Sequence, residues 1–434
     1  MSYHSGVLLL SYILVNYICL LKETVIAYFC TFEKTDLETL LAKSAIKLQR
    51  VSTQFMRDAL VKVTWADNRL IGIKGARGVG KTTLVLQYLK LSGFALEQAL
   101  YVSLDDLYFS MNRLYDLGAS FTRQGGLVLV LDEVHRYANW SQEIKNLYDD
   151  FPDLRIIFTG SSIIHLERGK GDLSRRAVMY QLPGLSFREF LRIQQLVAWS
   201  PVSLTDLLER HTQIAADLTA SFKPLAHWAD YLKHGYYPYF LENKEVYSQK
   251  LTETIALSLE IDLPSVYGIS YATVDKLKQL LVVLAESVPL KPNISKLSEQ
   301  LHTTRGLVVE YMHYLEELGI LLLLHRDSFG VTRLQKPEKV YLSHPNVHYA
   351  LHQSQPNKGT IRESFLLSQI HLGHQVEYTE DGDFKIDRQI TIEVGGASKN
   401  RRQLTNIEQA YVAANDIEVG YGRKIPLWLF GLLY

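Results

Sequence analysis

Cysteine is almost absent from this chain of 434 residues, and its two cysteines, Cys19 and Cys30, both lie near the start. The remaining chain therefore cannot hold a disulfide framework or a zinc site built from thiolates. Histidine offers no replacement, because no HExxH or HxxEH pattern occurs. His344 and His348 have helical ligand spacing, but Pro345 lies between them and no carboxylate is close by. We therefore predict no metal site there and expect a reducing compartment.

An excess charge is also absent, since 46 Lys and Arg residues balance 46 Asp and Glu residues. No global electrostatic field draws the protein to nucleic acid or to an anionic membrane, so a nucleic-acid contact would need a local patch. Hydrophobic residues make up 47% and charged residues 21%, which is typical of folded proteins. The length favours about three domains.

Residues 1–36 form an atypical apolar extension. The uninterrupted apolar run, Gly6–Leu21, has 16 residues and ends at Lys22-Glu23. A spanning helix needs about 20 apolar residues, and a signal peptide needs a basic start. Three interpretations stay open: an over-long gene model that truly begins near Asp36, a weak membrane anchor, or a packed segment. We expect a cytoplasmic protein without a membrane partner, with the weak N-terminal anchor as the alternative.

Short apolar strands alternate with helical segments over residues 37–190. A helix is predicted from Leu37 to about Val63. The predicted strands are Arg69–Lys74, Tyr101–Leu104, Leu127–Leu131 and Leu154–Thr159. Such alternation predicts an α/β domain with a parallel sheet covered on both faces.

The first strand runs into Gly75-x4-Gly80-Lys81-Thr82, which fits the phosphate-loop pattern GxxxxGK[ST]. Glycines allow a tight loop whose N–H groups point at phosphate oxygens, and the next helix directs its N-terminal dipole at the same anion. Lys81 would reach the β- and γ-phosphates of ATP, and the Thr82 hydroxyl would ligate Mg²⁺. The predicted nucleotide-binding residues are Gly75, Gly78, Val79, Gly80, Lys81, Thr82 and Thr83.

A second motif lies 51 residues after Lys81, where the strand Leu127–Leu131 runs into Asp132-Glu133. Asp132 at the mouth of the sheet would hold Mg²⁺, and Glu133 would act as the catalytic base toward water. This pair predicts an ATPase rather than a GTPase or a kinase. The run Asp132–His135 also looks like a helicase DExH box, which we reject because no second motor domain follows.

Four further residues are candidates for sensing the γ-phosphate. Thr159 and Ser161 come at the end of the fourth strand, where a hydroxyl would lie beside the attacking water, although a simple Ser/Thr turn is equally compatible. Arg175 and Arg176 would supply an arginine to the γ-phosphate. Their alternatives are solvated charges or an interdomain salt bridge.

A family resemblance rests on Ile71–Leu89 and three shorter stretches. These are LDEVHRYANW (131–140), FTGSS (158–162) and LSFREFL (185–191). They resemble bacterial and archaeal AAA+ superfamily ATPases with an uncharacterised C-terminal region, over roughly residues 37–434. The resemblance implies ATP binding and four parts. These are a P-loop AAA+ domain (37–190), a helical region (191–272), a winged helix (273–345) and an α/β restriction-endonuclease-like domain (346–434).

The predicted winged helix contains Ile294–Leu301 and Gly306–Leu318 as a helix-turn-helix, closed by Gly319. Ile320–Leu324 and Thr332–Leu334 would form the wing. Binding in a major groove would use Thr303, Thr304 and Arg305. Residues 291–339 hold seven Lys and Arg but six Asp and Glu, so we favour a packing module over a DNA surface.

The tail resembles the restriction-endonuclease fold at Asp383 and Glu393, with Glu363 as a possible third carboxylate. In that fold a lysine two residues past the second carboxylate supports catalysis, but Gly395 occupies this position. Lys399 would be the substitute. We predict an inactive domain that is retained for docking.

Two functions remain open at this stage. The first is an ATPase that uses ATP and Mg²⁺ and acts as a conformational switch on a protein or DNA partner, with an oligomer possible. The second is an ATP-binding DNA- or protein-recognition module in which turnover is incidental. Glu133 favours the first, because binding alone would not need a base.

Overall fold

The computed structural model describes residues 36–161, 173–287, 289–326, 336–352, 355–400, 404 and 407–434. The apolar run Gly6–Leu21, Ser162 and the predicted wing strand Thr332–Leu334 lie outside these residues. Within the described ranges, no helix has the length and apolar character needed to cross a bilayer.

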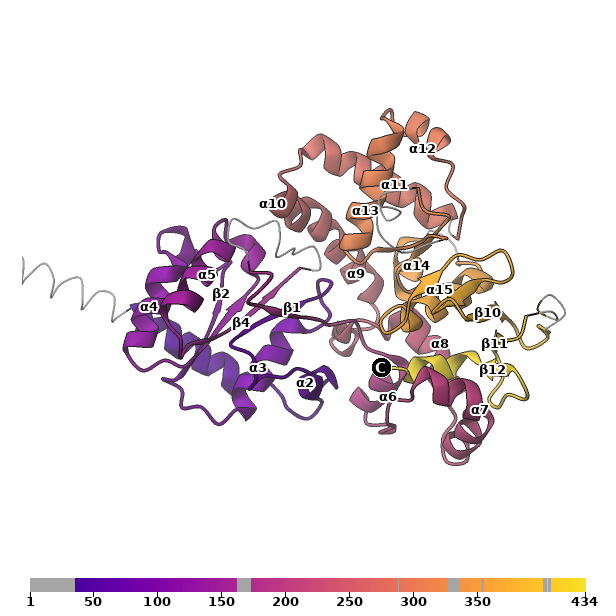
Figure 1. The fold of residues 1–434 in the computed structure, drawn as a ribbon, viewed down its shortest axis with the longest axis horizontal. Helices are drawn as coiled ribbons and strands as arrows, with labels where there is room; N and C mark the ends of the chain where they lie inside the picture. The colour runs from indigo at the N-terminus through magenta and orange to yellow at the C-terminus, as the bar shows by residue number, and fades with distance from the viewer. Residues whose placement is uncertain are drawn as a thin grey trace, which may run out of the picture.

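A five-stranded parallel sheet is the centre of the first part of the fold, shown in indigo to magenta in Figure 1. Its strands are β1 (Leu70–Lys74), β2 (Ala99–Ser103), β3 (Val128–Asp132), β4 (Arg155–Gly160) and β5 (Val178–Gln181). They lie in the order β2-β3-β4-β1-β5. The first four strands are buried on both faces, as expected for parallel strands between helices. The predicted parallel α/β sheet is confirmed.

Helices connect and cover these strands. They are a helix at residues 36–50, α2 (Ala59–Lys62), α3 (Lys81–Leu91), η1 (Leu107–Ser110), α4 (Leu114–Arg123), η2 (Val134–Arg136) and α5 (Trp140–Asp150). The prediction of one helix from Leu37 to Val63 is wrong, because the helix ends at residue 50 and a loop follows. Gln87 on α3 holds this loop, since its Nε2 donates to the carbonyls of Ser52 and Phe55, each at 2.8 Å.

A group of helices follows β5. They are α6 (Phe187–Ile193), α7 (Leu204–Thr219), α8 (Leu225–His234), η4 (Pro238–Leu241), α9 (Tyr247–Leu257), the π-helical turn η5 (Ser258–Asp262) and α10 (Leu263–Tyr267). Ser186 and Glu189 form a capping box at the start of α6. Asn346, from a much later segment, donates to the carbonyls of Tyr231 and Leu232.

Three helices and a two-stranded antiparallel sheet come next: α11 (Tyr271–Ser287), α12 (Ile294–Gln300), α13 (Arg305–Glu317), β6 (Leu321–Leu324) and β7 (Lys339–Leu342). Gly319 ends α13 with a φ of 74°, and the N–H of Ile320 reaches back to the carbonyl of Leu315. The strand paired with β6 is thus Lys339–Leu342, later in the sequence than the expected wing strand. The winged-helix assignment stays a prediction.

The tail begins with α14 (Pro345–Leu351) and α15 (Lys358–Ile370), then forms a second five-stranded sheet. Its strands are β8 (Val376–Glu377), β9 (Phe384–Ile386), β10 (Ile390–Gly395), β11 (Ala410–Ala414) and β12 (Lys424–Pro426). The sheet is mixed, with β8, β9 and β10 antiparallel and β10, β11 and β12 parallel. The apolar patterns of Lys385–Val394 and Pro426–Leu433 each predict strand structure. The first range forms the hairpin of β9 and β10, and the second is mostly the short helix η8 (Leu427–Leu432).

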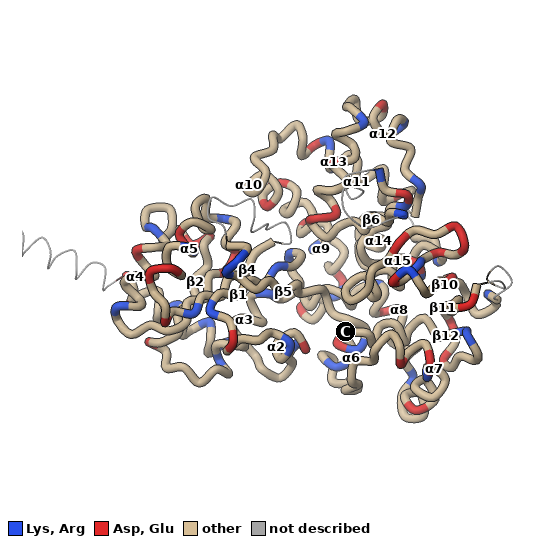
Figure 2. The backbone as a smooth tube through the Cα atoms, in the orientation of Figure 1, with Lys and Arg blue, Asp and Glu red and all other residues tan. Residues whose placement is uncertain are grey.

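The apolar core does not break at the predicted domain boundaries. One cluster of buried side chains runs from Leu48 and Val85 in the first part to Tyr231 in the helical region and Trp428 near the C-terminus. The end of the chain therefore packs against α6 and α7, as Figure 1 shows. Basic and acidic positions are interspersed over every part of the backbone (Figure 2), in line with the balanced charge.

Candidate nucleotide-binding site

The loop between β1 and α3 has the conformation that its glycines allow. Gly78 and Gly80 have φ values of 85° and 99°, a region that side chains with a Cβ rarely adopt. At Gly75 a Cβ would lie 2.4 Å from the carbonyl oxygen of Leu182. A larger residue at any of these three positions would therefore distort the loop.

Lys81 begins α3 and lies folded into this loop. Its side chain is buried, and Nζ donates to the carbonyls of Gly75 at 3.0 Å and Ala76 at 3.2 Å. Burial lowers the pKa of Lys81, although the nearby carboxylates of Glu133 and Asp132 oppose this shift. The two carbonyls of the loop therefore hold the amine in this structure.

Asp132, at the end of β3, accepts hydrogen bonds from three hydroxyls. Thr82 donates to Oδ2 at 2.7 Å, Tyr101 on β2 donates to Oδ2 at 2.6 Å, and Thr159 on β4 donates to Oδ1. Helix α3 and strands β2 and β4 therefore orient one buried carboxylate beside the phosphate loop. Burial, together with the Asp132 carboxylate, raises the pKa of Tyr101 and keeps that phenol a donor.

Glu133 follows directly and has a left-handed backbone with a φ of 55°. Its N–H donates to Thr159 Oγ1 at 3.3 Å, and its carboxylate lies 3.4 Å from His135 Nε2. This conformation is uncommon for a residue with a side chain and persists where the surroundings hold it. The partly exposed carboxylate reaches the same edge of the sheet as Lys81.

The predicted sensing residues divide into two groups. Thr159 and Ser161 lie at the phosphate-loop edge of the sheet, where the Ser161 N–H donates to His135 Nδ1 at 3.4 Å. Arg175 and Arg176 precede β5, which runs parallel to β1, so they lie at the opposite edge. Arg176 pairs there with Asp149 at 3.0 Å. The structure does not bring either arginine to the phosphate loop of its own chain.

A cavity of about 330 Å³ adjoins the loop on the side of Gly80. Among the residues that line it are Ser52, Phe55, Thr83, Arg192 and Pro238. No sequence pattern indicates this cavity, because its walls come from segments far apart in the chain.

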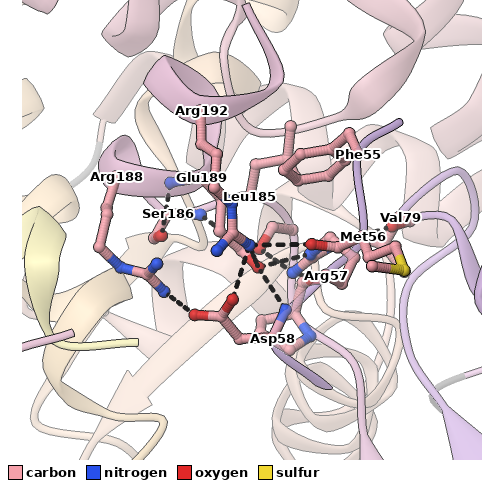
Figure 3. A network of polar contacts seen from close by, with 12 residues as sticks. Phe55, Met56, Arg57, Asp58, Val79, Leu185, Ser186, Arg188, Glu189 and Arg192 are labelled. Carbon is pink, nitrogen blue, oxygen red and sulfur yellow. Dashed lines mark hydrogen bonds and ion pairs between the residues drawn. The ribbon is translucent and has the colours of Figure 1, made fainter. Parts of the chain in front are cut away.

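Arg57 ties this cavity to the phosphate loop, as Figure 3 shows. Its guanidinium donates to Glu189 at 3.0 Å, to the Val79 carbonyl at 3.2 Å and to the carbonyls of Pro183 and Gly184. A buried arginine before β1 thus joins the loop to α6. No local pattern indicated this role.

Asp58, the next residue, extends the same network to two arginines of α6 (Figure 3). It pairs with Arg188, and with Arg192 at 2.6 Å. Burial raises the pKa of Asp58, but the hydrogen bonds and charges of Arg192 and Arg188 outweigh it and hold the pKa below its usual value. The stretch LSFREFL therefore packs against the segment that enters the phosphate-loop domain.

The tail carboxylates also come together. Glu363 accepts from Lys339 at 2.9 Å and from Tyr341 at 2.8 Å, while Glu393 pairs with Lys399 at 2.5 Å. Burial, followed by the charges of Glu363 and Glu393, raises the pKa of Asp383 to about 7. Across the described part of the chain, no three His, Cys, Asp or Glu side chains are arranged to hold a metal ion.

His344 and His348, which have helical ligand spacing, make other contacts. His344 caps α14 through the Asn346 N–H, and His348 Nε2 lies 2.8 Å from Ser364 Oγ. Burial holds the pKa of both imidazoles below the usual value, so both side chains are neutral at pH 7.

Comparison with known families agrees with this geometry. Residues 67–191 match the model of an AAA domain, which identifies this part as a P-loop nucleotide-binding ATPase domain. Residues 225–357 match a domain of unknown function, DUF8612. The first match spans the sheet, the phosphate loop and Asp132-Glu133.

Among individual proteins, an uncharacterised protein (MJ1637) of Methanocaldococcus jannaschii is 25% identical over 82% of this chain and 81% of its own length. AMPPCP-bound DnaA from Aquifex aeolicus is 15% identical, covers 60% of this chain and 85% of its own, and has a TM-score of 0.26. PCH-2 of C. elegans is 14% identical over 64% and 68%, with a TM-score of 0.23. At such TM-scores neither superposition supports a conclusion about this chain.

Proposed function

We propose that this protein is a magnesium-dependent ATPase that acts as a conformational switch, in which hydrolysis changes how the helical region contacts the AAA domain. One observation carries the proposal. Lys81, Thr82, Asp132 and Glu133 converge at one edge of the sheet, with the Thr82 hydroxyl 2.7 Å from the Asp132 carboxylate. A module that only binds nucleotide would not need Glu133 in this position.

Nucleotide binding would use the loop and the cavity together. The Lys81 amine would exchange the carbonyls of Gly75 and Ala76 for the β- and γ-phosphates, and the loop N–H groups would hold the phosphate oxygens. The 330 Å³ cavity beside Gly80 and Thr83 would take the nucleoside.

The donor set fits Mg²⁺, which prefers oxygen ligands. The Thr82 hydroxyl and the Asp132 carboxylate already share one hydrogen bond, so both oxygens face the same point. Tyr101 and Thr159 would hold Asp132 in orientation through their own hydrogen bonds. Bound there, Mg²⁺ would neutralise charge on the β- and γ-phosphates.

In the proposed reaction, the Glu133 carboxylate orients a water and accepts its proton as the γ-phosphoryl group is transferred. Thr159 contacts both Asp132 and the Glu133 N–H, so its hydroxyl is placed to respond to the γ-phosphate, with Ser161 beside it.

The test is steady-state phosphate release from ATP and from GTP with Mg²⁺, with and without DNA. We expect ATP turnover that Glu133→Gln lowers at least a hundredfold while ATP binding persists, as is typical for loss of a general base. Glu97→Gln, at an exposed glutamate, is the control and should keep the wild-type rate. Binding without turnover would favour the alternative, an ATP-binding DNA- or protein-recognition module.

A further inference from the structure

The helical region reaches the catalytic edge of the AAA domain through one buried carboxylate. Asp262 is the last residue of the π-helical turn η5 and is only 1% exposed. Its Oδ1 lies 3.3 Å from Nε2 of His135, a residue 127 positions earlier in the chain. The same Nε2 lies 3.4 Å from Oε2 of Glu133.

The neighbours of His135 determine where its proton lies. The backbone N–H of Ser161 points at Nδ1 at 3.4 Å, so Nδ1 is the acceptor nitrogen. Nε2 therefore carries the hydrogen, and this one N–H is shared between the carboxylates of Asp262 and Glu133. Among the described residues, His135 is the one ion-pair partner of the Glu133 side chain within 4.0 Å.

We propose that His135 and Asp262 are positioning residues for Glu133, and that they couple the placement of the helical region to the rate of hydrolysis. The proposal rests on the ATPase function proposed above. When Asp262 is close, it accepts a share of the hydrogen bond from His135 Nε2 and holds the imidazole in one orientation. The oriented imidazole in turn holds the Glu133 carboxylate in place. Arg77 of the phosphate loop lies 3.8 Å from the same Asp262 oxygen. Asp262 therefore contacts both the phosphate loop, through Arg77, and the Asp132–His135 stretch, through His135.

A movement of the helical region would act on this contact directly. η5 and α10 pack together, and α10 also contacts η2, which contains His135. Withdrawal of Asp262 would leave the whole His135 N–H to Glu133 and change its orientation toward water. The alternative is a purely structural role, in which His135 and Asp262 only join two parts of the core. Loss of such a contact would affect folding and nucleotide affinity but not kcat.

The experiment measures kcat, KM and ATP affinity of full-length variants. We expect His135→Ala to lower kcat at least tenfold with KM and affinity within threefold of wild type. His135→Gln should recover most of the rate, because the Gln amide places a donor near the position of Nε2. Asp262→Ala should resemble His135→Ala, and the double variant should be no slower than the slower single one.

The matched control is His234→Ala, which removes a histidine paired with Asp230 at 2.9 Å elsewhere in the helical region and should keep the wild-type kcat. A wild-type kcat in His135→Ala overturns the positioning role. So does a His135→Gln variant as slow as His135→Ala, or a parallel loss of ATP affinity and thermal stability in both. If the wild type itself releases no phosphate, the proposed ATPase function fails as well, and the same assay shows this first.

Discussion

Replacing Lys81 by alanine tests the phosphate site most directly. The amine is a buried cation at the loop. At roughly 4 Å from a phosphate charge, with an effective dielectric constant of about 20, it would contribute about 4 kcal/mol to binding. Loss of this interaction energy corresponds to a Kd for ATP that is roughly a thousandfold higher. We therefore expect Lys81→Ala to abolish measurable ATP binding at micromolar protein concentration.

The same change should hardly affect folding. Burial lowers the pKa of Lys81, which means that the charged amine is poorly solvated in the folded protein. Its removal costs two hydrogen bonds to the carbonyls of Gly75 and Ala76 but also takes away this poorly solvated charge, so the two effects on stability oppose each other. Calorimetric titration with ATP and Mg²⁺, together with a melting curve, separates these effects. Lys90→Ala, on the same helix but exposed, is the control. A Kd for Lys81→Ala within tenfold of wild type would refute the assigned phosphate site.

Three further predictions concern the rest of the chain. Arg57→Met should destabilise the fold by about 3–5 kcal/mol in urea unfolding, because the buried Glu189 loses the guanidinium that contacts it at 3.0 Å. Arg326→Ala, which removes an exposed arginine, should leave the urea midpoint nearly unchanged. The pKa of Asp383 is raised to about 7, so the folded protein holds a proton on this carboxyl that the unfolded chain has already lost above about pH 4, and the free energy of unfolding should fall as pH rises from about 4 to 7. Asp383→Asn should flatten that part of the profile. An unchanged slope would contradict the raised pKa. The tail should show no Glu393-dependent cleavage of DNA.

Local signals carry the prediction of the candidate phosphate site. The glycine spacing, Lys81 and Thr82 lie within eight consecutive residues, and apolar runs mark β1 and β3 without reference to distant partners. Strand boundaries shifted by one or two residues, as for β2, which is Ala99–Ser103 rather than Tyr101–Leu104. Such shifts do not matter for the site, because the motif residues follow the strands directly.

The residues that support the site gave no such signal. Tyr101, Arg57 and Asp262 act through partners 31, 132 and 127 positions away, and each would pass as an ordinary strand, loop or helix residue. His135 had a local clue, since it stands in the DEVH stretch, but that pattern suggested a helicase box.

The tail hairpin was predicted only in part: the ten-residue spacing of Asp383 and Glu393 indicated a hairpin, but the position of its turn was not located. Its turn uses Asp387 and Arg388 with φ values of 48° and 62°, conformations for which Asn and Gly are the usual signals. Neither residue is present at these two positions, so the sequence gives no local signal for the turn and Lys385–Val394 also fits one continuous strand. Tertiary packing of β9 and β10 overrides the local preference, and the hairpin brings Asp383 near Glu393.

The prediction that the tail does not cut DNA depends on how its charges are arranged. In Lys399 the aliphatic chain packs over Gly395, where a Cβ would lie 2.5 Å from Lys399 Cβ, and this places the amine on Glu393. Lys339 binds Glu363 in the same way, so two of the three carboxylates already have a cation, and a divalent metal would have to displace both. Because the domain's own lysines already neutralise these carboxylates, we favour a tail that serves for docking rather than for metal-dependent cleavage. Plasmid incubated with the full chain, ATP and Mg²⁺ or Mn²⁺ should stay intact. Cleavage by the wild type that disappears in Glu393→Ala would show that the tail is an active nuclease and refute this prediction.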